Sequence, residues 1–235
     1  MHGFVTKCSA LLLISLSAVP ALAQSVDQRW PICANKSGSH SLDQAIAACS
    51  ALIQTGQNSN NHLSMAYYNR DNAYRNKQDL DRAIAEYDQA IRLNARYAKA
   101  YNNRGLAYRH KQDLDRAIAS YDQAIRVDAQ YVGAYGNRGD AYAAKRDWNR
   151  ALADYDQAIR LGLQDAKAYY NRGNVYRNMR EWDHAIADYD QAIRLNPQYA
   201  KAYNNRGMAL IKLGKNAQGE ADIAKAKSID PNIGK

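Results

Sequence analysis

Residues 166–199 read AKAYYNRGNVYRNMREWDHAIADYDQAIRLNPQY, and this unit returns along the chain at a spacing of 34 residues. The dipeptide Asn-Arg marks each copy, at positions 69–70, 103–104, 137–138, 171–172 and 205–206. A fixed period of this length is typical of stacked supersecondary units, because one unit alone cannot bury its apolar face. The sequence therefore predicts a solenoid.

Each unit carries the same order of aromatic and small residues. In the quoted copy these are Tyr169, Arg172, Gly173, Tyr176, Ala185, Tyr189, Ala192 and Pro197. The order resembles the tetratricopeptide repeat family, whose signature has an aromatic residue, Leu-Gly, Tyr, Ala-x3-aromatic and Pro at these points. The resemblance implies an all-α fold, a right-handed α-solenoid of helical hairpins, with repeats at 64–97, 98–131, 132–165, 166–199 and 200–235.

The composition suits one folded domain rather than a disordered tail. The chain has 235 residues, of which 46% are hydrophobic and 23% are charged. Its 32 basic and 23 acidic residues give a net charge of +9. This surplus favours anionic partners without naming them.

Residues 1–23 have the pattern of a secretory signal peptide. Lys7 precedes an apolar run over residues 10–19, which is too short to span a bilayer as a helix, and Ala21-Leu22-Ala23 supplies a small-x-small cleavage site. We expect the chain to be exported, to be periplasmic or secreted, and to have no stable membrane insertion after cleavage. A membrane anchor is the alternative.

Export changes the meaning of the cysteines. Cys8 would leave with the signal peptide, and Cys33 and Cys49 would remain as an even pair in an oxidising compartment. We predict one disulfide between them. Two unpaired buried thiols are the alternative.

Both ends of the stack need a cap, because a terminal repeat has no neighbour on its outer face. Residues 24–63 are expected to form the N-terminal cap, in which an extended segment at 24–40 is stapled through Cys33 to a degenerate half-repeat that begins at Leu42. A polar, Asn-rich loop at 55–62 should follow. In the last unit we expect a polar face that closes the stack, made of Lys215, Gln218, Asp222 and Lys225.

The repeated arginines stand where the family pattern has Leu, and helical geometry places them on the mainly buried face of the first helix of each repeat. A buried guanidinium needs a partner, because an uncompensated buried charge is costly. We predict a structural ladder between Arg70, Arg104, Arg138, Arg172 and Arg206 and the residues Asp88, Asp122, Asp156 and Asp190. Counting does not decide whether the partners belong to the same or to neighbouring repeats. A binding role for the arginines is the alternative.

The repeated asparagines should lie on the opposite side of the same helices, which lines the concave groove of a two-helix solenoid. An amide can both donate to and accept from an extended peptide backbone. The set resembles the asparagine ladder in the repeats of the O-linked N-acetylglucosamine transferase, although Asn is common at this place in the family. The predicted peptide-binding groove comprises Asn69, Asn72, Arg75, Lys99, Asn103, Arg109, Asn137, Asp140, Lys167, Asn171, Asn174, Arg177, Lys201 and Asn205.

Charge and side-chain size vary along this groove. Cations outnumber acids, with Asp140 as the main acid, so the groove should favour acidic peptides or other polyanions. The middle unit has small residues at the groove positions Gly133, Gly136, Ala143 and Ala144. They would form a notch for a bulky partner group, or they reflect drift on a tolerant surface.

Enzyme motifs are missing from the sequence. It contains no His-Glu-x-x-His, Gly-x-Ser-x-Gly or Gly-x4-Gly-Lys, and its histidines lack metal-ligand spacing, so we expect no enzyme activity, metal or cofactor. The tyrosines are expected in the core, which argues against nucleic acid as a partner. The sequence predicts a non-catalytic scaffold that binds peptide segments of other proteins, with an anionic cell-envelope polymer as the alternative ligand. It does not indicate an oligomeric state.

Overall fold

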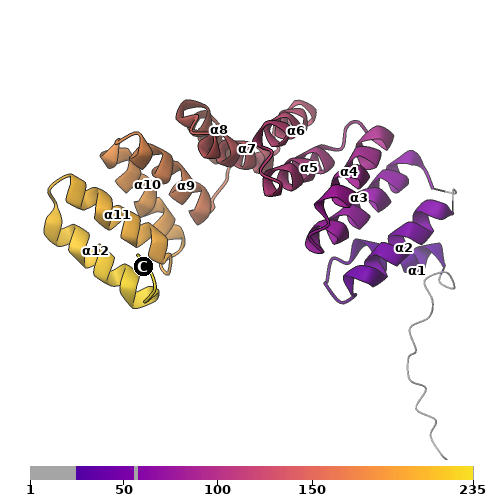
Figure 1. The fold of residues 1–235 in the computed structure, drawn as a ribbon, viewed down its shortest axis with the longest axis horizontal. Helices are drawn as coiled ribbons and strands as arrows, with labels where there is room; N and C mark the ends of the chain where they lie inside the picture. The colour runs from indigo at the N-terminus through magenta and orange to yellow at the C-terminus, as the bar shows by residue number, and fades with distance from the viewer. Residues whose placement is uncertain (1–24, 56–57, 235) are drawn as a thin grey trace, which may run out of the picture.

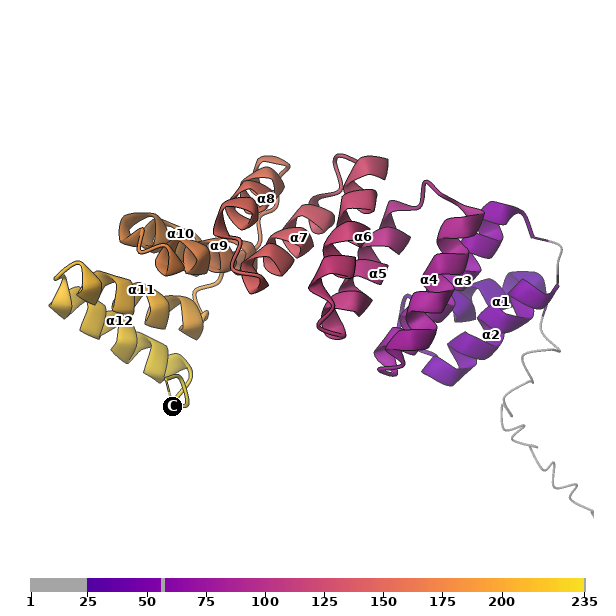
Figure 2. The same cartoon turned by 45° about the horizontal axis from the view of Figure 1, so that its top comes forward.

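The computed structural model describes residues 25–55 and 58–234, and over these ranges the chain is built only of helices and their connections. The helices stack in chain order into a curved solenoid (Figures 1 and 2). They are α1 (Val26–Ala34), α2 (Leu42–Gln54), α3 (Asn60–Asn76), α4 (Leu80–Leu93), α5 (Ala98–His110), α6 (Leu114–Val127), α7 (Val132–Ala144), α8 (Trp148–Arg160), α9 (Ala166–Asn178), α10 (Trp182–Leu195), α11 (Ala200–Lys212) and α12 (Asn216–Ile229). The predicted all-α solenoid of hairpins is confirmed. No helix in these ranges has the length and apolar character needed to cross a membrane.

Each hairpin is held by small residues that let a buried tyrosine fill the crossing point. Tyr121 of α6 is fully buried, and so are the tyrosines at the same position in the neighbouring repeats. Gly105 of α5 lies against its ring, where an added Cβ would stand 2.5 Å from Tyr121 Cε1. Gly105 therefore allows this close approach, because a side chain in its place would force the ring or the helix to shift.

The first helices lie on the inner side of the curve. Contacts between neighbouring first helices recur along the stack, from α5 to α7, from α7 to α9 and from α9 to α11. Figure 1 shows α5 and α7 on the inner side of the arch, with α6 and α8 above them. The groove that the sequence predicts is therefore formed by the odd-numbered helices.

The N-terminal cap differs from the prediction, because the segment expected to be extended contains helix α1. Ser25 caps this helix by accepting from the Gln28 backbone N–H, while the Gln28 side chain accepts from the Ser25 backbone N–H. A disulfide joins Cys33 of α1 to Cys49 of α2, which confirms the predicted pair. The cap is thus a short complete hairpin. The predicted signal peptide at 1–23 lies outside the described residues.

The connection into the first full repeat also differs from the prediction. Helix α3 begins at Asn60, inside the stretch expected to be a polar loop. Ser59 explains the early start, because its side chain accepts from the His62 backbone N–H at 3.4 Å and so caps the helix.

Candidate functional site

The repeated arginines bridge neighbouring repeats. In the second to fifth repeats the guanidinium of the first helix donates to a carboxylate of the preceding repeat's second helix and to a side chain of its own second helix. For Arg172 these distances are 2.6 Å from Nη1 to Asp156 Oδ1 and 2.8 Å from Nε to Asp188 Oδ2. The bonds to the preceding repeat are Arg104–Asp88, Arg138–Asp122, Arg172–Asp156 and Arg206–Asp190. The predicted ladder aspartates therefore each bind the arginine of the following repeat, which decides the choice that the sequence left open.

The partners within each repeat were missed by the sequence reasoning. They are Glu86, Ser120, Asp154, Asp188 and Asp222, which accept from Arg70, Arg104, Arg138, Arg172 and Arg206. These partners recur every 34 residues, but they are of three residue types, Glu, Ser and Asp, so the sequence pattern did not identify them as one set. Arg70, the arginine without an aspartate before it, donates instead to Ser50 Oγ at 2.9 Å. Asp222, expected on the polar outer face, is turned towards Arg206.

The electrostatics of this ladder fit a structural role. Burial acts to lower the pKa of Arg138, but hydrogen bonds to Asp154 and Asp122 outweigh it and raise that pKa. Burial raises the pKa of Asp154, and Arg138 offsets part of this rise. We take the pair as ionised at neutral pH, because arginine keeps its proton and its two N–H groups match a carboxylate. The arginines are therefore engaged by the fold itself.

The asparagine ladder does not present a row of open amides, which corrects the sequence interpretation. The side-chain nitrogen of Asn171 donates to Asp140 Oδ1 at 2.9 Å, across to the first helix of the preceding repeat. Asn103 and Asn205 make equivalent bonds, and Asn205 is only 7% exposed. Asn137 also bonds across to the preceding first helix, but to Asn102, one turn earlier, because Leu106 occupies the usual acceptor position. Asn69 lies near Cys33 Sγ, at 3.9 Å. The reason is that each first helix packs beside the next, so these amides link the inner side of the stack.

A second layer of this network was also missed. The hydroxyl of Tyr155 donates to Asp140 Oδ1 at 2.7 Å, and Tyr87 and Tyr189 donate in the same way to Asn72 and Asn174. Each of these acceptors also receives the asparagine of the following repeat. The constant spacing of 15 residues between the tyrosine and its acceptor was the sign available in the sequence.

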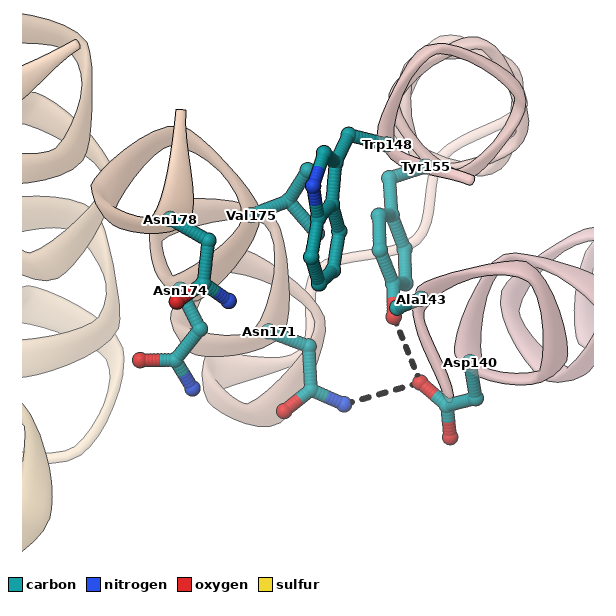
Figure 3. Close-up of a pocket in the computed structure, with 8 residues that line it drawn as sticks. All are labelled: Asp140, Ala143, Trp148, Tyr155, Asn171, Asn174, Val175 and Asn178. Carbon is teal, nitrogen blue, oxygen red and sulfur yellow. Dashed lines mark hydrogen bonds between the residues drawn. The ribbon is translucent and has the colours of Figure 1, made fainter. Parts of the chain in front are cut away.

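Asp140 is the point where most of these bonds meet. Its Oδ1 accepts from Tyr155 and Asn171, as Figure 3 shows, and its Oδ2 accepts from Arg109 Nη1 at 2.8 Å. Arg109 and Asp140, both predicted for the groove, are thus paired with each other. These three hydrogen bonds fix the orientation of the Asp140 carboxylate.

Two cavities flank the Asp140–Asn171 bond, and we call them together the notch. One has a volume of about 250 Å³, with Ala143, Trp148 and Val175 among its lining residues. Figure 3 shows the Trp148 ring beside Val175, with Asn174 and Asn178 along the opposite edge. The other has a volume of about 170 Å³ and is lined in part by Gly133, Gly136, Leu163 and Lys167. Each is several times the roughly 30 Å³ that one water occupies.

Three of the four small residues that predict a notch do line it. Gly133 and Gly136 border the smaller cavity and Ala143 borders the larger one. Ala144 borders neither and is exposed. The missed contributors are Trp148 and Leu163, which reach the notch from α8 and from the α8–α9 connection.

The notch opens at the junction between the third and fourth repeats, where a regular contact is missing. Earlier junctions carry a lysine–aspartate bridge, as between Lys77 and Asp43 at 2.5 Å, or between Lys145 and Asp115. At this junction the same positions are Met179 and Asn149. A further cavity of about 430 Å³ lies there, against Trp148 and Met179. This junction therefore combines a missing ion pair with open space beside Trp148.

The cations predicted for the groove divide into two groups. Lys99, Lys167 and Lys201 are exposed, while Arg75, Arg109 and Arg177 are half-buried. Within the described ranges, Arg109 is the one member of this set that forms a salt bridge. The five others leave positive charge along the inner side, and Lys167 places it at the notch itself.

What the notch can do chemically is hold a side chain. Its apolar wall suits a ring or a branched side chain, and its polar edge offers amides. In the described part of the chain Asn174 Nδ2 and Asn171 Oδ1 make no hydrogen bond. The other polar atom of each amide, Asn174 Oδ1 or Asn171 Nδ2, forms the bonds within the stack. The same part of the chain shows no group of three metal-ligating side chains.

Comparison with known structures places this geometry among repeat proteins. A crystal structure of MamA protein is 26% identical, with a TM-score of 0.66, and the match covers 72% of this chain and 92% of that one. YrrB, described as a TPR protein with an unusual peptide-binding site, is 23% identical with a TM-score of 0.68, and the match covers 80% and 95%. PilF from Pseudomonas aeruginosa is 15% identical with a TM-score of 0.76, covering 88% and 92%. The last two likenesses concern the fold alone.

Sequence comparison agrees with the structural one. None of the curated proteins compared with this chain matches it significantly. Models described as tetratricopeptide repeats match residues 166–199 and 188–221, and a model described as a TPR repeat matches 72–112, 105–146 and 139–179. Together these matches run without a gap from residue 72 to residue 221, and the chain therefore belongs to the tetratricopeptide repeat family.

Proposed function

We propose that this chain is a non-catalytic scaffold whose concave side binds extended, acidic peptide segments of partner proteins, with the notch as the anchor for one bulky side chain. The observation that carries the proposal is the notch itself. It combines an apolar wall at Trp148 and Val175 with amide groups that have bonding capacity to spare. Small-molecule and peptide sites have this character, mostly apolar with a few placed polar groups.

The charges near the notch support an acidic segment. Lys167 lines the smaller cavity, and Lys201 and Arg177 follow on the inner side without a carboxylate partner in the described ranges. Asp140 does not oppose them, because Arg109 neutralises it. A peptide with acidic residues beside its anchor would pair with these cations. The neighbour YrrB is described as having an unusual peptide-binding site, which is consistent with this role.

We also propose that the chain acts after export, in the periplasm or outside the cell. The support is the pattern of residues 1–23 together with the Cys33–Cys49 disulfide, since such bonds form and persist in oxidising compartments.

The test selects binding peptides from a phage-displayed library with the purified chain and measures their affinity by Trp148 fluorescence, with Trp30 and Trp182 replaced by Phe. Gly136→Arg should fill the smaller cavity without strain in the fold, because an added Cβ meets only Leu163 Cδ2 at 3.8 Å. We expect it to weaken the selected peptides at least tenfold. The matched control Ala153→Arg adds the same charge at an exposed position of α8 and should leave affinity unchanged.

Salt dependence separates the peptide from the alternative, an anionic polymer. Peptide affinity should fall only in part between low and high salt, because apolar burial at the notch is not screened. Polyphosphate serves as the polymer probe. If no peptide is selected, or if polyphosphate binds more tightly and Gly136→Arg does not affect it, the peptide proposal is wrong.

A further inference from the structure

Another cavity, of about 490 Å³, lies between α10, α11 and α12 and shares no residue with the notch. Leu210 and Arg206 of α11 line it, together with Ile186 of α10 and Gln218 of α12. Its origin is visible from the repeat period. The residues 34 positions apart that correspond to Leu210 are Tyr74, Tyr108, Tyr142 and Tyr176.

In the two preceding repeats this tyrosine covers the arginine of the ladder. The Arg172 guanidinium lies between two rings, 5.7 Å from the centroid of Tyr169 and 6.0 Å from that of Tyr176. Arg138 lies in the same way between Tyr135 and Tyr142, at 5.7 and 6.0 Å. Guanidinium groups stack well on aromatic faces.

In the last repeat one of the two rings is missing. Arg206 keeps Tyr203 at 5.4 Å, but Leu210 is too short to reach over it. A further replacement adds to the space: Gln218 stands where the other full repeats have Arg or His against the tyrosine ring, at positions 82, 116, 150 and 184. The chain thus shows, in its own other repeats, which side chain fits this place.

The charge around the cavity selects a neutral ring. The Arg206 guanidinium donates to Asp190 at 2.6 Å and to Asp222 at 2.7 Å, so three of its five N–H groups are engaged by carboxylates. Lys215 balances the second carboxylate at the rim. An anionic group would be repelled by the two aspartates, whose charges already offset those of Arg206 and Lys215.

We propose that this cavity binds a tyrosine side chain presented by a partner protein, with its ring stacked on Arg206 and packed against Ile186 and Leu210. The site is independent of the notch, so a partner could engage both sides of the solenoid.

The test is a methyl NMR titration of the whole chain from residue 24, using 4-methylphenol, which is the tyrosine side chain itself, as the probe. We expect saturable shifts of the Ile186 and Leu210 methyl signals, with a dissociation constant on the order of 1 mM for so small a ligand. Phenyl phosphate should bind at least tenfold more weakly. Acetyl-Ser-Tyr-Ser-amide should shift the same signals, and acetyl-Ser-Ala-Ser-amide should not.

Two substitutions test whether the missing tyrosine creates the binding site, one by filling this cavity and one by opening an equivalent cavity in the preceding repeat. Leu210→Tyr should fill the cavity and abolish the shift at Ile186, and Tyr176→Leu should open an equivalent cavity, reported by new shifts at Leu152. If Leu210→Tyr does not fold, Gln218→Trp at the mouth replaces it as the blocking variant. The proposal is overturned if the Ile186 shift is absent in the unmodified chain or survives the blocking variant. It is also overturned if sedimentation shows a dimer that the blocking variant dissociates, because a second copy would then be the occupant.

Discussion

Replacing Asp71 by Gly should stabilise the protein, although the change removes a charged residue from its first full repeat. Asp71 lies on α3 with no exposed surface, and neither carboxylate oxygen has a hydrogen-bond partner within the described part of the chain. The other full repeats have glycine at this position. The chain therefore holds a polar group where its own pattern needs none.

The magnitude follows from the loss of water. A buried polar group without a partner costs about 1–3 kcal/mol, and glycine in a helix costs a few tenths of a kcal/mol more than aspartate. The net gain in the free energy of unfolding for Asp71→Gly is therefore about 1–2 kcal/mol. For a chain of this length each 1 kcal/mol corresponds to roughly 2–4 °C in melting temperature.

The pH dependence gives a sharper signature. Burial raises the pKa of Asp71 well above 3.8, so the folded state holds this proton at pH values where the unfolded chain has released it. Stability from this group is complete below pH 3.8 and is lost as the pH rises towards the raised pKa. The advantage of Asp71→Gly over the unmodified chain should consequently grow with pH.

Urea unfolding followed by circular dichroism across pH 4–8 measures this difference. Asp71→Asn is the control that separates charge from polarity: it cannot ionise, so it should lose the pH dependence but keep the cost of an unpaired polar group. If Asp71→Gly were less stable than the unmodified chain, or if its advantage were the same at every pH, the carboxylate would have a partner and the reasoning would be refuted.

Three further predictions concern the contacts that hold the stack. Tyr121→Phe removes a buried hydroxyl that has no partner within the described residues and should raise the free energy of unfolding by about 1 kcal/mol, whereas Tyr155→Phe breaks a hydrogen bond and should lower it by about 1–2 kcal/mol; urea titrations of both compare them. Arg138→Leu leaves carboxylates without a cation and should cost about 2–4 kcal/mol by thermal denaturation, and an unchanged melting temperature would contradict the ladder. Reducing the disulfide between Cys33 and Cys49, which are 16 residues apart, should cost about 3 kcal/mol by calorimetry with and without dithiothreitol, and equal melting curves would contradict this.

The sequence predicts well what is local and repeated. The helical hairpins follow from the apolar period, and a carboxylate partner for Arg172 follows from the cost of burying its charge. Helix α1 was not predictable in this way, since it is short, contains Pro31 and has no sustained apolar period. It depends instead on the Ser25 cap and the disulfide to α2.

The amides show where single-helix reasoning ends. A helical wheel puts Asn171 opposite the face that carries Gly173 and Tyr176, but it cannot include the neighbouring helix that packs beside Asn171. In the stack, α7 brings Asp140 within 2.9 Å of Asn171, and the amide becomes a link between repeats. Replacing these asparagines by alanine would therefore disturb stacking as well as any ligand, which is why the peptide test uses Gly136→Arg instead.

The departures from the repeat are the places where the stack leaves space. A repeated contact fills its own surroundings, as the tyrosine over Arg172 does, so a cavity can form only where one copy lacks a member of the set. Leu106 shows the smallest case: it replaces the acceptor that Asn72, Asp140 and Asn174 provide in other repeats, and among the described residues the Tyr121 hydroxyl has no partner. Leu210 leaves a cavity above Arg206 for the same reason. In this chain most of the repeated side chains contact neighbouring repeats and are not free to bind a partner. Both proposed sites accordingly lie where one repeat departs from the common pattern.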